Sequence, residues 1–442
     1  MESKQPKLRL LQARILCVIA MGMGPGLSLA AAPAFSDANW TSLGSGMNKR
    51  VYALAASGSN VYAGGKFGMA GGSAANFIAK WDGRSWSALG SGVNGYVYAL
   101  AVAGSNVYAG GDFTTAGGST ANHIAKWNGS SWSALGNGMN GYYVQALAVS
   151  GNNLYAGGNF TTAGYSMANN IAEWNGSSWS ALGSGMNNAV YGLMVSGNDL
   201  YAGGDFTRAV YITVNSIAKW NGSSWSALGS GMSGSDPNSV YAMVVSGTNL
   251  YAGGLFSTAG ERGATSIAKW DGNTWTGVSW LGAGSGYYPS VPALAAWGSN
   301  LYAGGDFTTA GGSAANRIAK WDGSSWTALG SGLNGFVRAL ATSGCVLYAG
   351  GDFTTAGNKA SAFIARAYLP VVPALSVLPS GTDVMVSWPS ADTAGFHLEQ
   401  AGTLSAPASW VSNTASTTDD GINTWVTIPA TNTLQFFRLR CP

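Results

Sequence analysis

Side chains that commonly carry out catalysis are scarce in this sequence. The chain has 442 residues and only two histidines, His123 and His397, which lie far apart along it. No histidine cluster, Ser-His-Asp triad or zinc site can be built from them. We therefore expect no catalytic residues, no bound metal, no cofactor and no enzymatic activity.

Acidic residues recur at one position, which raises the possibility of a metal site. Each of them follows a double glycine, as in "GGDFTTAG", and they are Asp112, Asp205, Asp306 and Asp352. The equivalent positions elsewhere hold Lys66, Asn159 and Leu255, and no second oxygen ligand recurs at the spacing that hard cations require. We expect these acids to cap loops instead.

Aromatic residues are the strongest candidates for binding. Tryptophans recur at two fixed positions, and this regularity indicates packing rather than ligand recognition. Other aromatic residues break the repeated pattern and lie in its connections: Tyr96, Tyr142, Tyr143, Tyr165, Tyr211, Trp280, Tyr287, Tyr288 and Phe336. Exposed rings with little charge around them suit stacking on saccharides or anchoring a protein partner. The alternative is that these rings only cover loop backbone.

An internal repeat must position these residues. The tetrapeptide "YAGG" begins at seven tyrosines, separated by 46, 47, 46, 50, 51 and 46 residues: Tyr62, Tyr108, Tyr155, Tyr201, Tyr251, Tyr302 and Tyr348. Within each unit, short runs rich in aromatic and β-branched residues alternate with Gly, Asn, Asp and Ser. Each unit therefore predicts four antiparallel strands joined by tight turns.

Sheets of this kind have two apolar faces, which they can bury only against neighbouring copies. Four strands in each unit of 40 to 50 residues thus predict an all-β protein, a β-propeller with seven blades. Because strands alternate in direction, the connections after second and fourth strands emerge on the same face. The candidate aromatic residues should therefore surround a shallow bowl.

The two ends of the repeat complement each other. The seventh unit stops after its third strand, whereas the segment "NWTSLG" near the N-terminus has the pattern of a fourth strand. Trp40 lies 22 residues before Tyr62, the usual step from a fourth strand to the next unit. We expect this strand to complete the last blade, close the propeller and remove an open sheet edge.

Over residues 39–368 the units resemble kelch repeats. The second strand ends in a double glycine, the third ends in an aromatic residue followed by Asp or Asn, and a Trp follows on the fourth, as in "NVYAGG", "KWDG" and "SSW". The resemblance implies that first strands line a central channel, that fourth strands lie on the outer rim, and that a terminal strand closes the propeller. We assign residues 35–368 to this domain.

A second domain follows the repeats. The stretch "LPVVP" at 369–373 reads as a stiff linker, and residues 374–442 contain alternating strand patterns. They resemble a fibronectin type III or immunoglobulin-like β-sandwich, with Trp388 as the core tryptophan. The segment is short for that family, so its sheet order stays open. The resemblance implies a stalk or surface-attachment module.

The N-terminal 34 residues have the pattern of a secretory signal peptide. A basic stretch precedes the apolar run "ILCVIAMGMGPGLSLAAA", and "APA" at 32–34 provides a cleavage site. An uncleaved membrane anchor is the alternative. After cleavage only Cys345 and Cys441 remain, and the sequence leaves open whether they pair.

The function that we expect follows from these observations. The balance of 21 basic and 18 acidic residues gives a formal charge of +3, which does not indicate a nucleic acid partner. We expect an exported, monomeric, non-enzymatic binding protein, secreted or at the cell surface, which recognises a glycan or a protein through the aromatic-rich face. The alternatives are a carbohydrate-active enzyme on a propeller scaffold and a structural adhesin or surface-array component.

Overall fold

The structure is a computed structural model of the chain. It describes residues 34–440 except 235–237, 279–280, 284–288, 371–374, 381–382, 390–395, 403–409, 421 and 430–435. Residues 1–33 of the predicted signal peptide lie outside the described residues, as do Trp280, Tyr287, Tyr288 and Cys441. The described residues form β-strands and turns, with one 3-10 turn, η1 (Asp37–Asn39), which confirms the all-β class. Within these ranges no helix is long and apolar enough to cross a lipid bilayer.

Residues Asn39–Tyr368 form one compact unit of antiparallel sheets. Within the described part of this unit, six main sheets have four strands and another has six. The first strands are β2 (Val51–Ser57), β8 (Val97–Ala103), β14 (Tyr143–Ser150), β20 (Val190–Ser196), β27 (Ser239–Ser246), β34 (Ser290–Trp297) and β39 (Val337–Ser343). The second strands are β3 (Asn60–Gly65), β9 (Asn106–Gly111), β15 (Asn153–Asn159), β21 (Asp199–Gly204), β28 (Asn249–Leu255), β35 (Asn300–Ala310) and β40 (Val346–Gly351).

The outer strands are shorter. The third strands are β6 (Ile78–Trp81), β12 (Ile124–Trp127), β18 (Ile171–Trp174), β24 (Ile217–Trp220), β31 (Ile267–Trp270), β37 (Ile318–Trp321) and β43 (Ile364–Tyr368). The fourth strands are β7 (Trp86–Ala88), β13 (Trp132–Ala134), β19 (Trp179–Ala181), β25 (Trp225–Ala227), β32 (Trp275–Gly277), β38 (Trp326–Ala328) and, from the N-terminal end, β1 (Trp40–Ser42).

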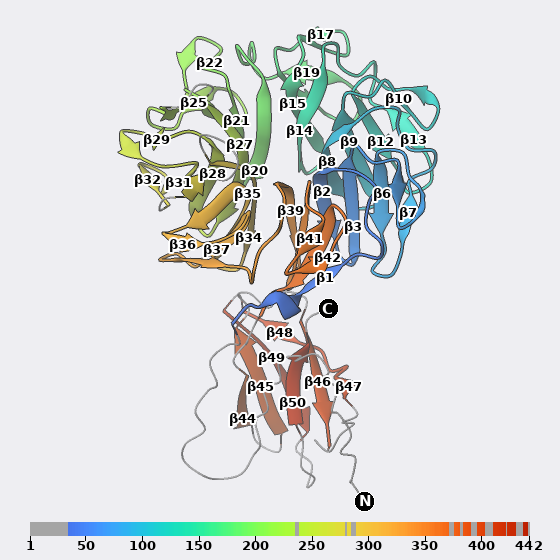
Figure 1. The fold of residues 1–442 in the computed structure, drawn as a ribbon, viewed down its shortest axis with the longest axis vertical. Coiled ribbons are helices and arrows are strands. Elements are labelled where there is room, and N and C mark those ends of the chain that lie inside the picture. Colours follow the sequence, from blue (N-terminus) through green and yellow to red (C-terminus); the bar gives the residue numbers. More distant parts are fainter. Residues whose placement is uncertain are drawn as a thin grey trace, which may run out of the picture. The chain divides into compact units, whose positions relative to one another are not determined.

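Between its second and third strands, each sheet carries a small hairpin. The hairpins are β4 (Met69–Ala70) with β5 (Ser73–Ala74), β10 (Thr115–Ala116) with β11 (Ser119–Thr120), β16 (Thr162–Ala163) with β17 (Ser166–Met167), β22 (Arg208–Ala209) with β23 (Ile212–Thr213), β29 (Thr258–Ala259) with β30 (Arg262–Gly263), the end of β35 with β36 (Ser313–Ala314), and β41 (Thr355–Ala356) with β42 (Lys359–Ala360). Two further strands extend this layer, because β26 (Met232–Ser233) pairs with β29 and β33 (Leu281–Ala283) pairs with β35. The hairpins β10 and β22 lie at the outer edge of the unit, whereas β14, β20 and β2 lie near its centre (Figure 1).

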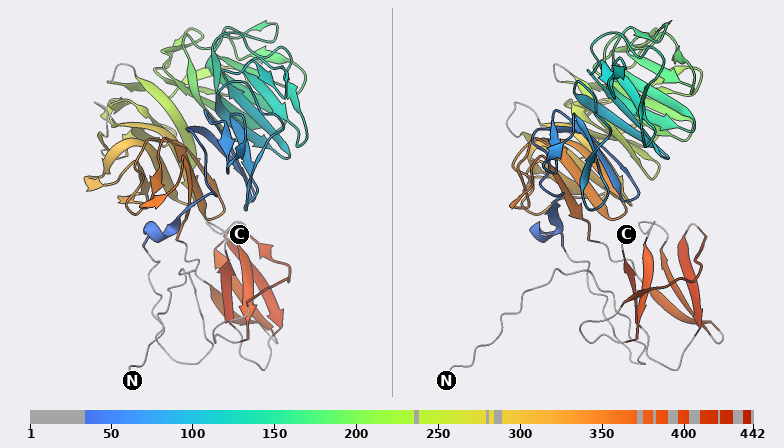
Figure 2. Two further views of the ribbon diagram at one scale, coloured as in Figure 1. Left: turned by 45° about the vertical axis from the view of Figure 1, so that its right-hand side comes forward. Right: turned by 90° about the vertical axis from the view of Figure 1, so that its right-hand side faces the viewer.

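Each sheet is buried on both faces by its neighbours. In one hydrophobic cluster, Tyr62 and Ile78 of the first sheet pack with Val97 and Val107 of the second. Equivalent clusters combine residues of consecutive sheets further along the chain. Ile, Val and Ala at fixed repeat positions therefore supply both apolar faces, as the repeat predicts. Figure 2 shows the sheets from two further directions, grouped around a common centre.

The tryptophans join neighbouring sheets, as their regularity predicts. The indole Nε1 of Trp86 donates to the Leu43 carbonyl oxygen at 2.9 Å, and Trp132 donates to Leu89 in the same way at 2.7 Å. The same bond recurs in the other sheets. In each sheet from β6–β7 to β37–β38, the third-strand and fourth-strand indole rings lie 5.2 to 5.5 Å apart. Packing and one indole hydrogen bond per sheet thus account for these residues.

The N-terminal strand completes the last sheet, which confirms the predicted pairing. β1 pairs with β43 in the register Trp40 with Ala367 and Ser42 with Ala365. Trp40 is fully buried, and its Nε1 donates to the Leu329 carbonyl oxygen of the preceding sheet at 3.0 Å. The first strands contact one another in sequence from β2 to β39, and β39 contacts β2. Sheets packed side by side around a centre in this way form a β-propeller.

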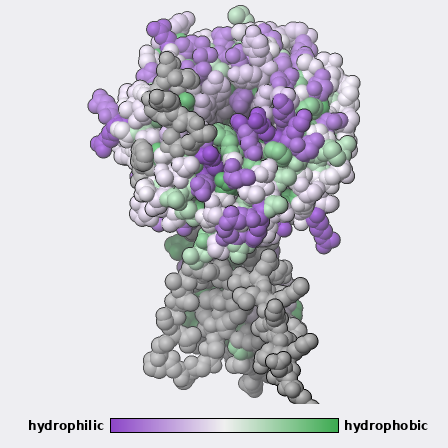
Figure 3. Space-filling model, viewed as in Figure 1, coloured by the Kyte–Doolittle hydropathy of each residue, from purple (hydrophilic) through white to green (hydrophobic). Residues whose placement is uncertain are grey.

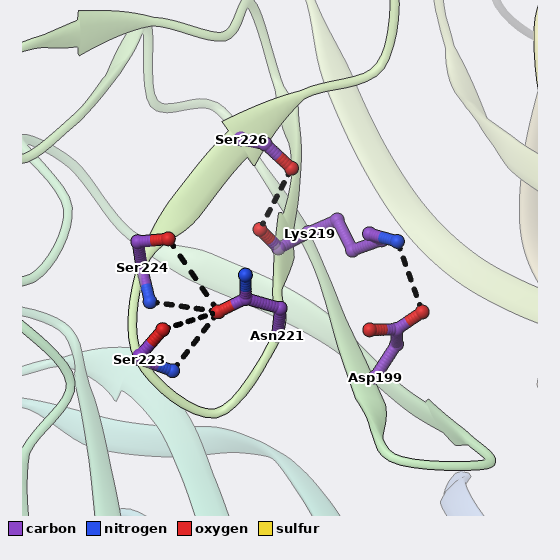
Figure 4. A network of polar contacts seen from close by, with 6 residues as sticks. All are labelled: Asp199, Lys219, Asn221, Ser223, Ser224 and Ser226. Carbon is purple, nitrogen blue, oxygen red and sulfur yellow. Dashed lines mark hydrogen bonds and ion pairs between the residues drawn. The ribbon is translucent and has the colours of Figure 1, made fainter.

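Asn and Asp side chains fix the turns between strands. In the turn after β24, Asn221 Oδ1 accepts hydrogen bonds from the backbone nitrogens of Ser223 and Ser224, both at 2.9 Å (Figure 4). Asp82, Asn128, Asn175, Asp271 and Asp322 make the same pair of bonds in other sheets. These side chains replace the missing backbone partners of a tight turn.

Residues 369–442 contain two further sheets. One has the order β44 (Ser376–Ser380), β45 (Asp383–Pro389), β49 (Asn423–Pro429) and β48 (Thr418–Asp419), and the other has the order β47 (Val411–Ser412), β46 (His397–Ala401) and β50 (Phe436–Arg440). Val386 and Trp388 of the first sheet share a hydrophobic core with Leu398 and Phe437 of the second. Trp388 is therefore a core residue, as the sequence predicts.

The closure of the propeller can be tested at Trp40. We expect Trp40→Ala to lower the free energy of unfolding by about 3 kcal/mol or more, because it removes a fully buried indole and its hydrogen bond. Trp225→Ala, at the equivalent position of an internal sheet, is the matched control and should cost a similar amount. Urea unfolding measures both. A near-neutral Trp40→Ala beside a costly Trp225→Ala would show that the terminal strand does not hold the propeller together.

The turn aspartates predict a pH dependence of stability. Backbone N–H groups hold the pKa values of Asp82, Asp271 and Asp322 below their usual range. Because the folded pKa lies below the unfolded value of about 3.9, each carboxylate stabilises the fold above that pH, and this contribution is lost as the pH falls. Replacing all three with Asn, the residue found in three other turns, should preserve the fold and flatten the acid side of a stability–pH profile. An unchanged profile would contradict this origin.

Candidate functional site

The double glycine of the repeat shapes the inner end of each sheet. A Cβ on Gly64 would lie 2.4 Å from Cγ1 of Val97 in the next sheet, and one on Gly65 would lie 2.2 Å from the Arg50 carbonyl oxygen. Only glycine allows both approaches. Opposite the two glycines, the first strand contains a β-bulge, so that its ladder shifts between Val51 and Ala53 and leaves Tyr52 unpaired.

The same irregularity occurs in the first strand of every sheet of the unit. A bulge re-aims a side chain that regular pleating would place elsewhere. The residues that follow the first-strand valines all line one central cavity of about 790 Å³, and we call them the mouth tier: Tyr52, Tyr98, Gln145, Tyr191, Tyr241, Pro292 and Arg338. All seven are partly exposed.

Two apolar tiers lie beyond the mouth tier along the first strands. The next position holds only Ala or Gly, in residues Ala53, Ala99, Ala146, Gly192, Ala242, Ala293 and Ala339. The position after that holds Leu54, Leu100, Leu147, Leu193, Met243, Leu294 and Leu340. The cavity is therefore polar and aromatic at its mouth and aliphatic inside, which is typical of a small-molecule site. The face in Figure 3 is mostly white and purple, with small green areas and no broad apolar patch.

Three of the four acids after the double glycines contact the mouth tier, and the fourth, Asp306, pairs with Arg317. Tyr98 donates its hydroxyl to Asp112 Oδ2 at 3.0 Å, and Tyr191 donates to Asp205 Oδ2 at 3.1 Å. Arg338 binds Asp352 through both Nε and Nη2, at 2.7 and 2.9 Å. The expectation that these acids cap loops is wrong for Asp352 and incomplete for Asp112, which also accepts a hydrogen bond from the Tyr96 backbone nitrogen. Asp112, Asp205 and Asp352 thus orient side chains at the cavity mouth.

Burial controls the protonation of these groups. Burial first, and the neighbouring aspartate second, raise the pKa values of Tyr98 and Tyr191, so both keep their hydroxyl protons. Burial raises the pKa of Asp205 and lowers that of His123. The mouth therefore presents two neutral phenol groups that are held by carboxylates, those of Tyr98 and Tyr191.

Aromatic rings continue outward from the mouth tier. Tyr52 lies 5.6 Å from Tyr98 between ring centroids, and Tyr98 lies 6.0 Å from Tyr143. Tyr96 contacts Tyr52 at 6.3 Å and Phe77 at 5.8 Å. These distances are within the range of favourable ring pairs, so the rings support one another.

A second variable position lies directly before each third strand. The residue before each third strand has a positive φ of 63° to 70° without being glycine: Phe77, His123, Asn170, Ser216, Ser266, Arg317 and Phe363. Such a conformation costs of the order of 1 kcal/mol or more for a residue with a Cβ. The side chains compensate by local contacts, because Phe77 packs on Tyr96, Asn170 donates to the Met186 carbonyl oxygen, and Arg317 pairs with Asp306 at 2.8 Å.

The structure separates the predicted binding residues into groups. Tyr96, Tyr143 and Phe336 lie beside the mouth tier, and Phe336 lines the cavity. Tyr165 and Tyr211, which are 96% and 91% exposed, lie at the tips of the outer hairpins β16–β17 and β22–β23. Tyr142 is 74% exposed on the loop before β14. Trp280, Tyr287 and Tyr288 lie outside the described residues.

The sequence analysis missed four tyrosines and an arginine of the mouth tier: Tyr52, Tyr98, Tyr191, Tyr241 and Arg338. A signal for them exists, since the first strands read "VYALA", "VQALA", "VPALA" and "VRALA" with one variable position in a constant frame. The alternation of apolar and polar residues along the strand does not predict that this position faces the channel, because the β-bulge changes the direction of its side chain.

The described residues offer no metal site and no free thiol at the mouth. Within those ranges no group of three or more His, Cys, Asp or Glu could hold a metal ion. Cys345 is buried and disulfide-bonded, and Cys441 lies outside the described residues.

Comparisons with known proteins identify similar structures and no family. No protein-family model matches the chain, and no curated protein matches it. The computationally designed Ika8 protein is similar in structure, with a TM-score of 0.42 and 16% sequence identity over 73% of this chain and 98% of that one. BamB from Moraxella catarrhalis has a TM-score of 0.35 and 12% identity over 72% of this chain and 83% of its own. The designed Ika4 protein has a TM-score of 0.28 and 20% identity, with 40% and 92% covered.

The pairing of Tyr191 with Asp205 can be tested by titration. Tyr191→Phe removes the donor to a partly buried carboxylate, so the Asp205 pKa should rise further and the free energy of unfolding at pH 7 should fall by about 1–3 kcal/mol. Part of this loss should be regained as the pH is lowered through the raised pKa. Carbon-detected NMR of the carboxyl group measures the pKa. Tyr241→Phe is the control, and an equal shift in that variant would refute the specific pairing.

Proposed function

We propose that residues 39–368 form a seven-bladed, kelch-like β-propeller that binds a saccharide without catalysis at its central cavity. The observation that carries this proposal is the mouth tier, in which four partly buried tyrosines surround a cavity of about 790 Å³. A cavity of this size is in the range of small-ligand sites. Saccharides combine apolar ring faces with many hydroxyl groups, and the mouth combines aromatic rings with oriented polar groups.

The polar partners support recognition of an uncharged or weakly charged ring. Carboxylates fix the Tyr98 and Tyr191 hydroxyls, so that the phenol oxygens remain as acceptors for sugar hydroxyls. The Gln145 amide adds both a donor and an acceptor at the same level. Pre-positioned groups of this kind reduce the entropy that ligand binding must overcome.

The engagement of the acids favours binding over hydrolysis. A glycosidase uses one carboxyl group as an acid and another as a base or nucleophile. Here Asp112 and Asp205 each accept a tyrosine hydroxyl, and Asp352 is bound by two arginines. Carboxylates held in this way have structural partners already. Three alternatives remain. The protein is a carbohydrate-active enzyme, it binds a protein ligand, or it is a purely structural adhesin or surface-array component.

The remaining parts of the chain complete the proposal. Residues 1–34 would act as a signal peptide, and residues 369–373 as a linker. Residues 374–442 would be a fibronectin type III or immunoglobulin-like β-sandwich, an assignment supported by the core shared between two sheets. The mature protein would be a monomer, either secreted or retained at the cell surface.

Alanine substitution in the mouth tier tests the proposal. We expect Tyr98→Ala and Tyr241→Ala each to weaken the binding of a saccharide selected on a glycan array at least tenfold, because each removes a partly buried ring from the site. Calorimetry on the purified chain measures the affinity. Tyr211→Ala removes a tyrosine from an outer hairpin and serves as the matched control, with unchanged affinity.

The outcomes separate the alternatives. Loss of binding in the Tyr211→Ala variant alone would move the site to the outer hairpins. Turnover of the bound saccharide by the wild-type chain would refute a non-enzymatic role. Absence of binding to any glycan would favour a protein ligand or a structural role.

A further inference from the structure

Three basic residues come from the first and last sheets of the propeller, and we call them the basic cluster: Arg50, Lys66 and Arg338. Each is the only basic residue in its repeat position. The position of Arg50 otherwise holds Tyr, Ala, Ser or Phe, that of Lys66 holds Asp, Asn or Leu, and that of Arg338 holds Tyr, Gln or Pro. The packing of the sheets therefore does not require a base at any of them.

The basic cluster has a defined geometry. Arg338 and Arg50 share the carboxylate of Asp352, with Nε to oxygen distances of 2.7 and 3.3 Å. The Lys66 backbone nitrogen donates to the Arg50 carbonyl oxygen at 2.9 Å, which places the two residues side by side. Arg338 lies 4.5 Å from the centre of the Phe336 ring and 5.5 Å from that of Tyr52. The three bases are thus fixed among the aromatic rings of the mouth.

Lys66 is the least neutralised of the three. Its Nζ lies 4.9 Å from the centre of the Tyr96 ring, and among the described residues no carboxylate lies within 4.0 Å of it. The Arg50 side chain is 51% exposed. Asp352 thus pairs with two of the three cations, and the side chains of Arg50 and Lys66 are accessible to a ligand.

The charge is unevenly distributed around the mouth. Arg317 and Asp306 neutralise each other in the sheet before Arg338. Asp112 and Asp205 lie in sheets without a mouth base, where tyrosines are their side-chain partners. The first strands follow one another around the centre in the order β2, β8, β14, β20, β27, β34, β39 and back to β2. The basic cluster lies in the sheets of β2 and β39. Asp205 lies in the sheet of β20, which is three strands away from each of them. The three bases thus lie on one side of the mouth, Asp205 lies opposite to them, and Asp112 lies in the second sheet, next to the basic cluster.

We propose that the ligand is an acidic saccharide whose ring packs on Tyr52 and Tyr98 while its anionic substituent binds Arg50 and Lys66. This inference rests on the proposed saccharide site and specifies its ligand class. The guanidinium group presents paired donors that match the oxygens of a carboxylate or a sulfate, and the ammonium adds a point charge beside it.

Two matched pairs of oligosaccharides test the proposal by calorimetry on the purified chain. One pair is an oligogalacturonate and its methyl ester, and the other is a sulfated galactan oligosaccharide and its desulfated form. We expect the acidic member of at least one pair to bind tenfold or more tightly than its neutral counterpart, and the preferred pair identifies the anionic group. Raising the ionic strength should reduce this preference.

Two double variants test whether Arg50 and Lys66 cause the preference for the acidic oligosaccharide. Arg50→Gln combined with Lys66→Gln should abolish the preference for the acidic member, with an unchanged melting temperature because both side chains are at the surface of the mouth. The double variant Arg208→Gln and Arg262→Gln removes the same charge from exposed positions on the outer hairpins β22–β23 and β29–β30, and it should retain the preference.

The results of these measurements either support or overturn the preference for an acidic saccharide. Equal binding of acidic and neutral members in both pairs, or a preference that survives in the Arg50/Lys66 variant, overturns the inference. If the chain binds acidic and neutral members equally and Tyr98→Ala abolishes this binding, the proposed saccharide site is supported and only the preference for an acidic ligand is refuted. If the wild-type chain binds none of the four probes, the acidic-saccharide inference fails and the saccharide function loses its support.

Discussion

The close approach between the double glycine and the neighbouring sheet is the constraint on which the rest of the propeller depends. Where Gly64 meets Val97, there is no space for a single methyl group. This contact sets how tightly neighbouring sheets pack at their inner ends, and the fourth-strand tryptophans secure their outer ends. With both ends fixed, the angle between sheets is determined, and the ring can close only with a definite number of them.

The same contact links packing to function. Opposite the double glycine, the first strand of the same sheet bulges, and the bulged residue of each sheet lines the central cavity. The framework therefore repeats while the side chains at the mouth differ, since neither the glycines nor the valines depend on what the bulged residue is. A scaffold with constant packing and variable mouth residues suits recognition of an asymmetric ligand. The proposed distribution of tyrosines, acids and bases around the mouth is one such asymmetry.

Much of the fold could be predicted from the sequence, whereas the site could be predicted only in part. Spacing between identical residues showed the repeat, the strand order and the pairing of Trp40 with the last sheet, because these depend on local patterns that recur. Tyr52 and Tyr191 were missed because a β-bulge interrupts the alternation of side chains between the two faces of the strand. No residue pattern within a single unit predicts this bulge. Tyr165 and Tyr211 were grouped with Tyr96 because loops on the same face share a direction, but their distance from the channel axis depends on the hairpins, which fold outward. The roles of Asp112 and Asp352 depended on partners fourteen residues earlier, Tyr98 and Arg338, which only the register of the strands brings together.

The pairing of β1 with β43 has a consequence for how the chain reaches its native state. Trp40 and Ala367 are neighbours in one sheet, yet 327 residues separate them along the chain, from the difference of their numbers. During synthesis the segment around Trp40 emerges before the last repeat and must remain unpaired until that repeat has appeared. Contacts of such long range are slow to form, and the bare edge of β43 is exposed until they do. The pairing of β1 with β43 is therefore a late step of folding. A chain truncated before Ile364 lacks β43, the strand with which the N-terminal strand pairs.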